Sequence, residues 1–264
     1  MPPLIGVFDS GFGGLTVLRE LRRALPAADY HYFGDTAHLP YGAKSVRTVA
    51  KYAIAAAHFL EQHKIEMLVV ACNTATALAF DDIRAAVKVP VVGVVEPGAQ
   101  RAAAISSSRK AVVIATEATV SSHAYQKALH GLGLDALEKA CPLFVPLVEE
   151  GWVEHPVTEQ VARIYMDELF CDGARDADVL VLGCTHYPLL RPLLRRVVPR
   201  RVEIVDSAES TAAKVVELLK IIPDHSQAGG LRCYATDSVE KFRRLGSRFL
   251  GCPIPHVELI DIEK

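Results

Sequence analysis

The chain contains the stretch Met67-Leu-Val-Val-Ala-Cys72-Asn73-Thr74, and a second copy of its pattern, Val179-Leu-Val-Leu-Gly-Cys184-Thr185-His186. In both copies a short aliphatic run, rich in β-branched residues, ends on a cysteine, and helix-forming sequence follows. Runs that are apolar at every position are typical of strands buried on both faces of a parallel sheet. Each cysteine is therefore predicted at the carboxyl end of a strand, where open α/β sheets bind ligands.

The predicted position of the two thiols beside helix N-termini bears on their reactivity. The helix dipole and free N–H groups favour a thiolate, so we expect lowered pKa values for Cys72 and Cys184. One such thiol in each half of the chain suggests a site with two matched bases. Core packing, a zinc site with His186 and a dithiol redox pair are alternatives, although the Cys-x-x-Cys spacing typical of the last two is missing. The other four cysteines are predicted to be structural.

Strands and helices alternate along nearly the whole chain, which predicts an α/β fold of parallel sheets flanked by helices. The predicted strands are Leu4–Phe8, Tyr30–Phe33, Leu68–Ala71, Val91–Val94, Ala111–Ala115, Leu143–Val145, Val179–Leu182, Val202–Val205, Leu231–Ala235 and His256–Leu259. The predicted helices are Leu15–Ala24, Val46–Gln62, Ala75–Val87, one from about Gly98, Ser121–His130, Val157–Phe170, Leu189–Val198, Thr211–Leu219 and Val239–Phe249.

Two cysteine-tipped strands predict two similar lobes rather than one long sheet. The chain is expected to cross between them at Glu96-Pro97-Gly98 and to return at Asp206-Ser207. Residues 1–96 and 207–264 would then form the first lobe and residues 97–206 the second. The active site is expected in the cleft between the lobes.

Composition excludes several classes of protein. Lys and Arg number 29 against 31 Asp and Glu, a net charge of -2, so neither nucleic acid nor an anionic membrane is an expected partner. No run of about 18 uncharged apolar residues predicts a membrane span. The chain reaches an aspartate at Asp9 without a signal-peptide pattern, and six cysteines do not make a disulfide framework. We therefore expect a cytoplasmic protein.

Polar loops follow the first two predicted strands. Asp9-Ser10-Gly11-Phe12-Gly13-Gly14 suits either a carboxylate ligand at a helix N-terminus or a tight turn capped by Asp9. It lacks the lysine of a phosphate-binding loop. Gly34-Asp-Thr-Ala-His-Leu-Pro-Tyr41-Gly42 offers a backbone donor to a ligand or forms an ordinary turn.

Two ionisable groups elsewhere could also face a cleft. Glu149 and Glu150 follow the predicted strand Leu143–Val145, and two adjacent acids there are either catalytic or simply solvated. His186 is either a proton carrier beside Cys184 or a structural histidine.

Five motifs in order resemble the glutamate racemase family of the aspartate/glutamate racemase superfamily. They are Phe8-Asp-Ser-Gly-Phe-Gly-Gly-Leu15, Gly34-Asp-Thr-Ala-His-Leu-Pro-Tyr-Gly42, Ala71-Cys-Asn-Thr-Ala-Thr76, Pro146-Leu-Val-Glu-Glu-Gly151 and Gly183-Cys-Thr-His-Tyr-Pro-Leu189. The resemblance implies two similar α/β domains and interconversion of L- and D-glutamate, which supplies D-glutamate for bacterial peptidoglycan.

The resemblance also implies roles for individual residues. Cys72 and Cys184 match the two catalytic cysteines, and Asp9, Glu149 and His186 match the groups that assist them. Positions that match substrate contacts are Asp9, Ser10, Tyr41, Gly42, Asn73, Thr74, Thr116, Thr119, Thr185 and His186. Ala115 stands where many members have glycine, which weakens the match of the Thr116–Thr119 loop.

Racemisation removes the Cα proton and returns one to the opposite face, so two near-equivalent bases fit the reaction. No lysine is recognisable as a pyridoxal Schiff-base site, so we expect no cofactor. The cysteines lack the close spacing of a zinc site, so we expect no metal. A racemase of aspartate or another acidic amino acid is the alternative within the enzyme class. A non-catalytic amino-acid-binding or redox protein on the same fold is the alternative outside it. The sequence leaves a homodimer open.

Overall fold

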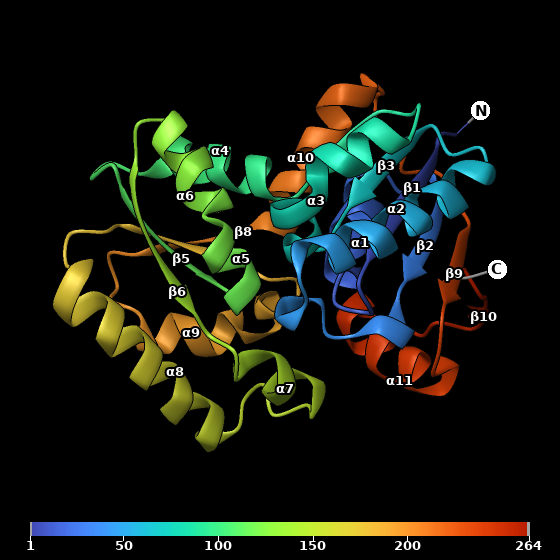
Figure 1. Cartoon of the computed structure of the whole chain (residues 1–264). Coiled ribbons are helices and arrows are strands. Elements are labelled where there is room, and N and C mark those ends of the chain that lie inside the picture. The colour runs from blue at the N-terminus through green and yellow to red at the C-terminus, as the bar shows by residue number, and fades with distance from the viewer. Residues whose placement is uncertain (1, 263–264) are drawn as a thin grey trace.

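Two parallel sheets form the centre of the molecule in the computed structural model, which describes residues 2–262 (Figure 1). The larger sheet has six strands in the order β10-β9-β2-β1-β3-β4. The strands are β1 (Leu4–Asp9), β2 (Asp29–Gly34), β3 (Met67–Val70), β4 (Val91–Gly93), β9 (Leu231–Ala235) and β10 (Glu258–Leu259). The smaller sheet has four strands in the order β6-β5-β7-β8. Its strands are β5 (Lys110–Ala115), β6 (Asp135–Ala140), β7 (Val179–Gly183) and β8 (Glu203–Asp206). The predicted fold class is confirmed.

Helices cover both faces of each sheet (Figure 1). Those that begin before residue 123 are α1 (Leu15–Ala24), α2 (Val46–Gln62), α3 (Asn73–Ala86), α4 (Val95–Ile105) and α5 (Glu117–Ser122). Those that follow are α6 (Ala124–Gly131), α7 (Phe144–Glu149), α8 (Pro156–Glu168), α9 (Arg191–Val197), α10 (Ser207–Leu219) and α11 (Val239–Leu250). Short turns of other helix types are η1 (Thr36–His38), η2 (Tyr41–Ala43), η3 (Leu169–Gly173) and η4 (Tyr187–Leu190).

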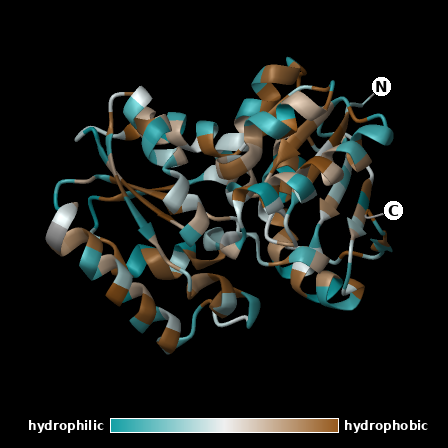
Figure 2. Cartoon of the chain, in the orientation of Figure 1, coloured by the Kyte–Doolittle hydropathy of each residue, from teal (hydrophilic) through white to brown (hydrophobic). Residues whose placement is uncertain are grey.

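Alternation along β5 shows why the central strands are apolar at every position. Ala111 and Val113 face a core formed with α4 and α6, whereas Val112 and Ile114 face the core formed with α8 and α9. Because successive side chains point to opposite faces, a strand covered on both sides must be apolar throughout. Figure 2 shows these apolar strands inside and hydrophilic residues on the outer sides of the helices.

The two sheets share packing rather than standing apart. Strand and helix residues of the larger sheet, such as Val7 and Leu18, belong to the same apolar core as Leu182 and Leu193 of the smaller one. Helix α10 packs against both α1 and α4, so it joins the two halves. The predicted division into residues 1–96 with 207–264 and residues 97–206 stays a prediction.

The structure differs from the predicted elements in three places. Leu143–Val145 is not a strand, because this segment leads into α7, whose Phe144 and Val148 are buried on one helical face. The strand of this region is β6, which pairs with β5 at the sheet edge. The predicted helix Ser121–His130 is split into α5 and α6 by His123, whose φ is 54°. Glu96, Pro97 and Gly98, where the chain is predicted to cross between the lobes, lie in the first turn of α4, and the crossing itself stays a prediction.

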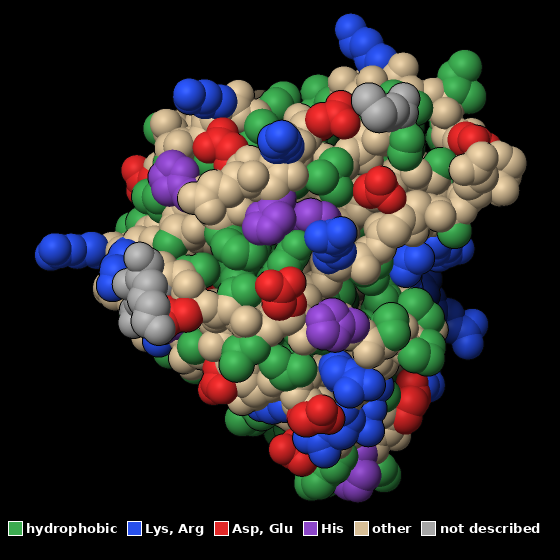
Figure 3. Space-filling model, turned by 90° about the vertical axis from the view of Figure 1, so that its right-hand side faces the viewer, with side chains coloured by type: hydrophobic (Ala, Val, Ile, Leu, Met, Phe, Trp, Pro, Cys, Tyr) green, Lys and Arg blue, Asp and Glu red, His purple; other side chains and the backbone are tan. Residues whose placement is uncertain are grey.

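The surface is charged with both signs. On the face shown in Figure 3, acidic and basic side chains are interspersed. Within residues 2–262 no helix is long and apolar enough to cross a lipid bilayer.

Candidate active site

A cavity of about 510 Å³ lies where the carboxyl ends of β3 and β7 face each other. Residues from both sheets line it, and among them are Cys72 and Cys184. The lining residues are Ser10, Leu39, Pro40, Tyr41, Gly42, Ala43, Cys72, Asn73, Thr74, Thr116, Glu117, Pro142, Val145, Pro146, Glu149, Cys184, Thr185, His186 and Lys241. The structure therefore brings together most of the predicted site residues.

Cys72 lies between β3 and α3 and caps the helix. Its Sγ accepts a hydrogen bond from the backbone N–H of Ala75 at 3.4 Å and donates one to Ser10 Oγ at 3.5 Å. Only 5% of the residue is exposed. Because Ser10 belongs to the loop after β1, two neighbouring strands of the larger sheet hold this thiol.

Cys184 follows β7 of the smaller sheet and is also 5% exposed. The segment after it is η4, a 3₁₀ turn, followed by α9. Backbone N–H groups of His186 and Tyr187 lower the pKa of the Cys184 thiol. The local arrangement thus resembles that of Cys72, with N–H groups of the following turn directed at the sulfur.

The predicted lowering of the two thiol pKa values is wrong. Burial raises the pKa of Cys72 from 9.0 to about 12, and the nearby Asp9 adds to the rise. Burial likewise raises the pKa of Cys184, and Cys72 contributes to this increase. Loss of hydration destabilises the thiolate more than the nearby backbone N–H groups stabilise it. Burial therefore favours the neutral form of both thiols.

Asp9 ends β1 and is 1% exposed. Its Oδ2 accepts a hydrogen bond from Gly11 N at 2.9 Å. Burial raises the pKa of Asp9, although backbone N–H groups and the imidazole of His186 oppose this rise. A carboxyl group with a raised pKa close to Cys72 suits proton exchange with that thiol.

His186, Glu149 and Lys241 form a connected group at the edge of the cavity. His186 Nε2 lies 3.4 Å from Glu149 Oε1, and Lys241 Nζ lies 3.4 Å from Glu149 Oε2. The His186 ring also contacts Phe249 of α11, with ring centroids 4.9 Å apart. Burial raises the pKa of Glu149, but the opposing effect of His186 and Lys241 is larger. The pKa of Glu149 is therefore lowered overall. Glu149 therefore remains an anion beside the imidazole.

Hydroxyl groups from both halves also meet at the cavity. Thr74 Oγ1 lies 3.0 Å from Thr116 Oγ1 and 3.2 Å from Thr119 Oγ1. Thr119 is fully buried and does not line the cavity, so it supports the other two. Thr16 Oγ1 donates to the carbonyl of Thr185 at 3.0 Å, which ties α1 to the loop after β7.

The loop before α2 supplies Tyr41 and Gly42 to the cavity lining. Tyr41 Oη donates to Asp35 Oδ2 at 2.6 Å, and Tyr41 is 1% exposed. Gly42 lines the cavity and a Cβ there would lie 3.0 Å from Thr116 Cβ. Close approach to the second half of the chain thus explains the glycine.

The comparisons with known proteins agree with this geometry. The family model for Asp/Glu/hydantoin racemases matches residues 5–215. The glutamate racemase of Koribacter versatilis is 58% identical, over 98% of each chain. The chain belongs to the glutamate racemase family. It is thus an amino-acid racemase, as its motifs predict.

Solved structures resemble the racemase over nearly its whole length. Glutamate racemase RacE1 of Bacillus anthracis has a TM-score of 0.92 at 37% identity, covering 98% of this chain and 97% of that one. The Francisella tularensis glutamate racemase, solved with D-glutamate, has a TM-score of 0.90 at 35% identity, covering 99% and 98%. The aspartate racemase of Picrophilus torridus is 18% identical, with a TM-score of 0.60 over 84% and 96%, and shows the fold alone.

Several lining residues of the racemase were not predicted. Lys241 comes from α11, far from every motif, and no local pattern marks it. Val145 and Pro142 were missed because the segment around them was predicted as a strand. Asp9 and Thr119 are predicted site residues that do not line the cavity themselves. In residues 2–262 no group of three or more His, Cys, Asp or Glu side chains is arranged to hold a metal ion.

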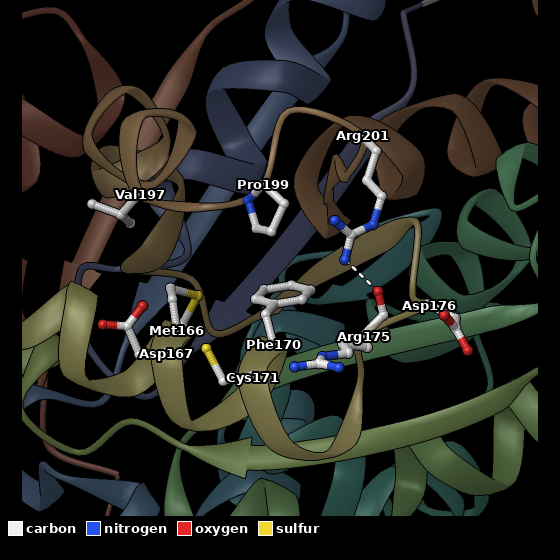
Figure 4. A pocket seen from close by; sticks show the side chains of 9 residues that line it. All are labelled: Met166, Asp167, Phe170, Cys171, Arg175, Asp176, Val197, Pro199 and Arg201. Atoms are coloured by element: carbon white, nitrogen blue, oxygen red, sulfur yellow. Dashed lines mark hydrogen bonds between the residues drawn. The ribbon is translucent and has the colours of Figure 1, made fainter.

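A second cavity, of about 410 Å³, lies beside α8 and the loop that follows α9 (Figure 4). Phe170, Cys171, Arg175 and Arg201 are among the residues that line it, and Arg201 donates to the carbonyl of Arg175. Its lining includes a single thiol, so it offers no pair of matched bases.

Proposed function

We propose that this racemase interconverts L-glutamate and D-glutamate with Cys72 and Cys184 as the two bases. One observation carries the proposal: two buried thiols, at strand ends of two different sheets, line one cavity. A substrate held between them would present opposite faces of Cα to the two sulfurs. Relatives named glutamate racemases, one of them solved with D-glutamate, support glutamate as the substrate.

The reaction is a balanced exchange of protons. One cysteine, as a thiolate, takes the Cα proton and becomes a thiol, while the electron pair of the C–H bond stays on the substrate. The opposite thiol then gives its proton to the other face and becomes a thiolate. The reverse reaction swaps the two roles, which explains two near-equivalent cysteines. Each sulfur should lie about 3–3.5 Å from Cα, so the sulfurs should be about 6–7 Å apart.

Because both thiol pKa values are raised, the bound substrate would itself help to form the thiolate. Burial raises the pKa of both thiols and so favours their neutral form. The α-ammonium group of an amino acid brings a positive charge between them, and an opposite charge within a few ångströms favours the thiolate. In the direction in which Cys72 is the base, Asp9 would take the proton of Cys72 while Cys184 stays a thiol. In the reverse direction His186, held by Glu149, would take the proton of Cys184 while Cys72 stays a thiol. Thiolate then forms only when there is a carbon acid to attack.

The remaining predicted residues would bind the two carboxylates. Ser10, Asn73, Thr74, Thr116 and Thr185 line the cavity and offer hydroxyl or amide groups. Tyr41 and Gly42 would contribute backbone N–H groups, and Thr119 would support Thr74 and Thr116. Fixed donors in a water-poor cavity stabilise the charge that develops on the α-carboxylate. The product, D-glutamate, would supply peptidoglycan synthesis.

Purified protein incubated with D-glutamate and with D-aspartate in D₂O, without added cofactor, tests this function. We expect L-glutamate with deuterium at Cα and little change in aspartate. Faster turnover of aspartate than of glutamate would show that the protein is an aspartate racemase instead. Absence of both deuterium exchange and racemisation would leave an amino-acid-binding or redox protein.

A further inference from the structure

Tyr125 lies at the boundary between the two halves of the molecule and is fully buried. It stands in the first turn of α6, which packs on the smaller sheet, yet its hydroxyl reaches α3 of the larger one. Tyr125 Oη donates a hydrogen bond to Asn73 Oδ1 at 2.6 Å. Asn73 directly follows Cys72, so this phenol touches the residue next to one thiol.

The ring of Tyr125 also lies close to the backbone next to the second thiol, that of Cys184. Gly183 directly precedes Cys184, and a Cβ at Gly183 would lie 3.0 Å from Tyr125 Cε2. The ring therefore packs closely against the backbone of Gly183, where any side chain would crowd it. One side chain thus contacts the neighbours of both cysteines, through its hydroxyl on one side and its ring edge on the other.

The hydrogen bond also fixes the orientation of the Asn73 amide. Asn73 lines the cavity and is 3% exposed. Its Oδ1 is occupied by the phenol, whereas its Nδ2 is buried and has no hydrogen-bond partner among the described residues. A buried donor without a partner is costly, and an amide N–H pairs well with a carboxylate oxygen.

We propose that Tyr125 is a positioning residue: it holds the Asn73 amide so that Nδ2 donates to a carboxylate of the bound amino acid. The inference rests on the proposed glutamate racemase function and deepens it. Without the phenol oxygen, the amide loses the partner that fixes its orientation. The substrate would then be bound less tightly, and less well aligned between the sulfurs.

A double-mutant cycle with Tyr125→Phe and Asn73→Ala tests the proposal, because removal of the hydroxyl keeps the ring. We expect each single variant to lower kcat/KM about tenfold or more, mostly through a higher KM. In the Asn73→Ala background, Tyr125→Phe should change kcat/KM by less than about twofold, since its effect passes through Asn73.

Tyr30→Phe is the matched control. Tyr30 is also buried, and its hydroxyl donates to the carbonyls of Leu21 and Leu25, at 3.0 and 2.9 Å, away from the cavity residues. It should lose similar thermal stability to Tyr125→Phe but keep the KM of the wild type. Equal losses of kcat/KM from Tyr125→Phe in both backgrounds, or an unchanged KM in Asn73→Ala, would overturn the role of Tyr125.

Assays of the wild-type protein distinguish failure of the Tyr125 role from failure of the racemase function. A wild-type protein that racemises glutamate while Tyr125→Phe keeps its KM contradicts the positioning role alone. A wild-type protein that neither racemises glutamate nor binds it in a calorimetric titration contradicts both proposals.

Discussion

Lys241 Nζ and Glu149 Oε2 lie 3.4 Å apart and join α11 to α7 beside the cavity. The other oxygen of Glu149, Oε1, lies 3.4 Å from His186 Nε2. The Glu149 carboxylate therefore connects the Lys241 ammonium group with the His186 imidazole, which follows Cys184 by two residues. Among the described lining residues, Lys241 is the one lysine, and there is no arginine. The ionisation of Glu149 thus depends on a residue far from it in sequence.

Replacing Lys241 with methionine should move the acidic limb of the pH profile of kcat/KM to higher pH. The lowered pKa of Glu149 keeps it ionised as pH falls, and loss of the ammonium raises that pKa. The decrease at the acidic end should reach about fivefold, as expected of a half-exposed ion pair. Lys110→Met, which removes a surface pair with Asp176, is the control. Identical profiles for the two variants would show that Lys241 does not act on Glu149.

Cys72→Ala and Cys184→Ala should each reduce racemisation by about a thousandfold or more, because a single base cannot serve both faces of Cα. Each variant should still eliminate HX from a β-leaving-group analogue, since that needs only one base, and the two should prefer opposite enantiomers. Cys171→Ala, an exposed cysteine outside the cavity, is the control. Substantial racemisation by either active-site variant would rule out the two-thiol scheme.

Asp9→Asn should chiefly slow the direction in which Cys72 is the base, and His186→Asn the direction that uses Cys184. The equilibrium constant between free enantiomers is unity, so kcat/KM must fall equally in both directions. The asymmetry therefore lies in kcat, with a compensating change in KM. Isotope effects from each enantiomer would locate the slowed proton transfer. If both variants keep the wild-type kcat in both directions, Asp9 and His186 serve as structural caps and take no part in proton transfer.

Stability should fall at alkaline pH because of the buried thiols. Burial raises the pKa of Cys72 from 9.0 to about 12, so above pH 9 the unfolded chain has lost a proton that the folded one retains. The free energy of unfolding must then decrease as pH rises from 9 towards 12. Denaturant unfolding of wild type and Cys72→Ala measures this, and the variant should show the shallower decrease. Equal slopes would mean that Cys72 titrates alike in both states.

The sequence predicts the strands of the sheet centres and the thiol positions well, because those follow from local pattern. It fails where tertiary contacts decide. Asp135–Ala140 carries Leu, Glu, Lys and Ala, which favour helix, yet pairing with β5 makes it a strand. The apolar segment Phe144–Glu149 has the residues of a strand but buries its side chains with helical spacing. Lys241 and Tyr125 reach the site only through folding, and no motif includes them.

The sign of the thiol pKa shift also lay beyond sequence. A cysteine before a helix predicts a lowered pKa, and the N–H groups near both sulfurs are present as expected. The degree of burial at Cys72 and Cys184 depends on how the two sheets close over them. That burial outweighs the local effect.

A crystal structure with D-glutamate bound tests the central claim most directly, namely that two thiols face opposite sides of one Cα. We predict that the sulfurs of Cys72 and Cys184 lie about 3–3.5 Å from Cα on opposite faces and about 6–7 Å from each other. Glutamate bound with both sulfurs on one face of Cα, or with either sulfur more than about 5 Å from it, would contradict the account.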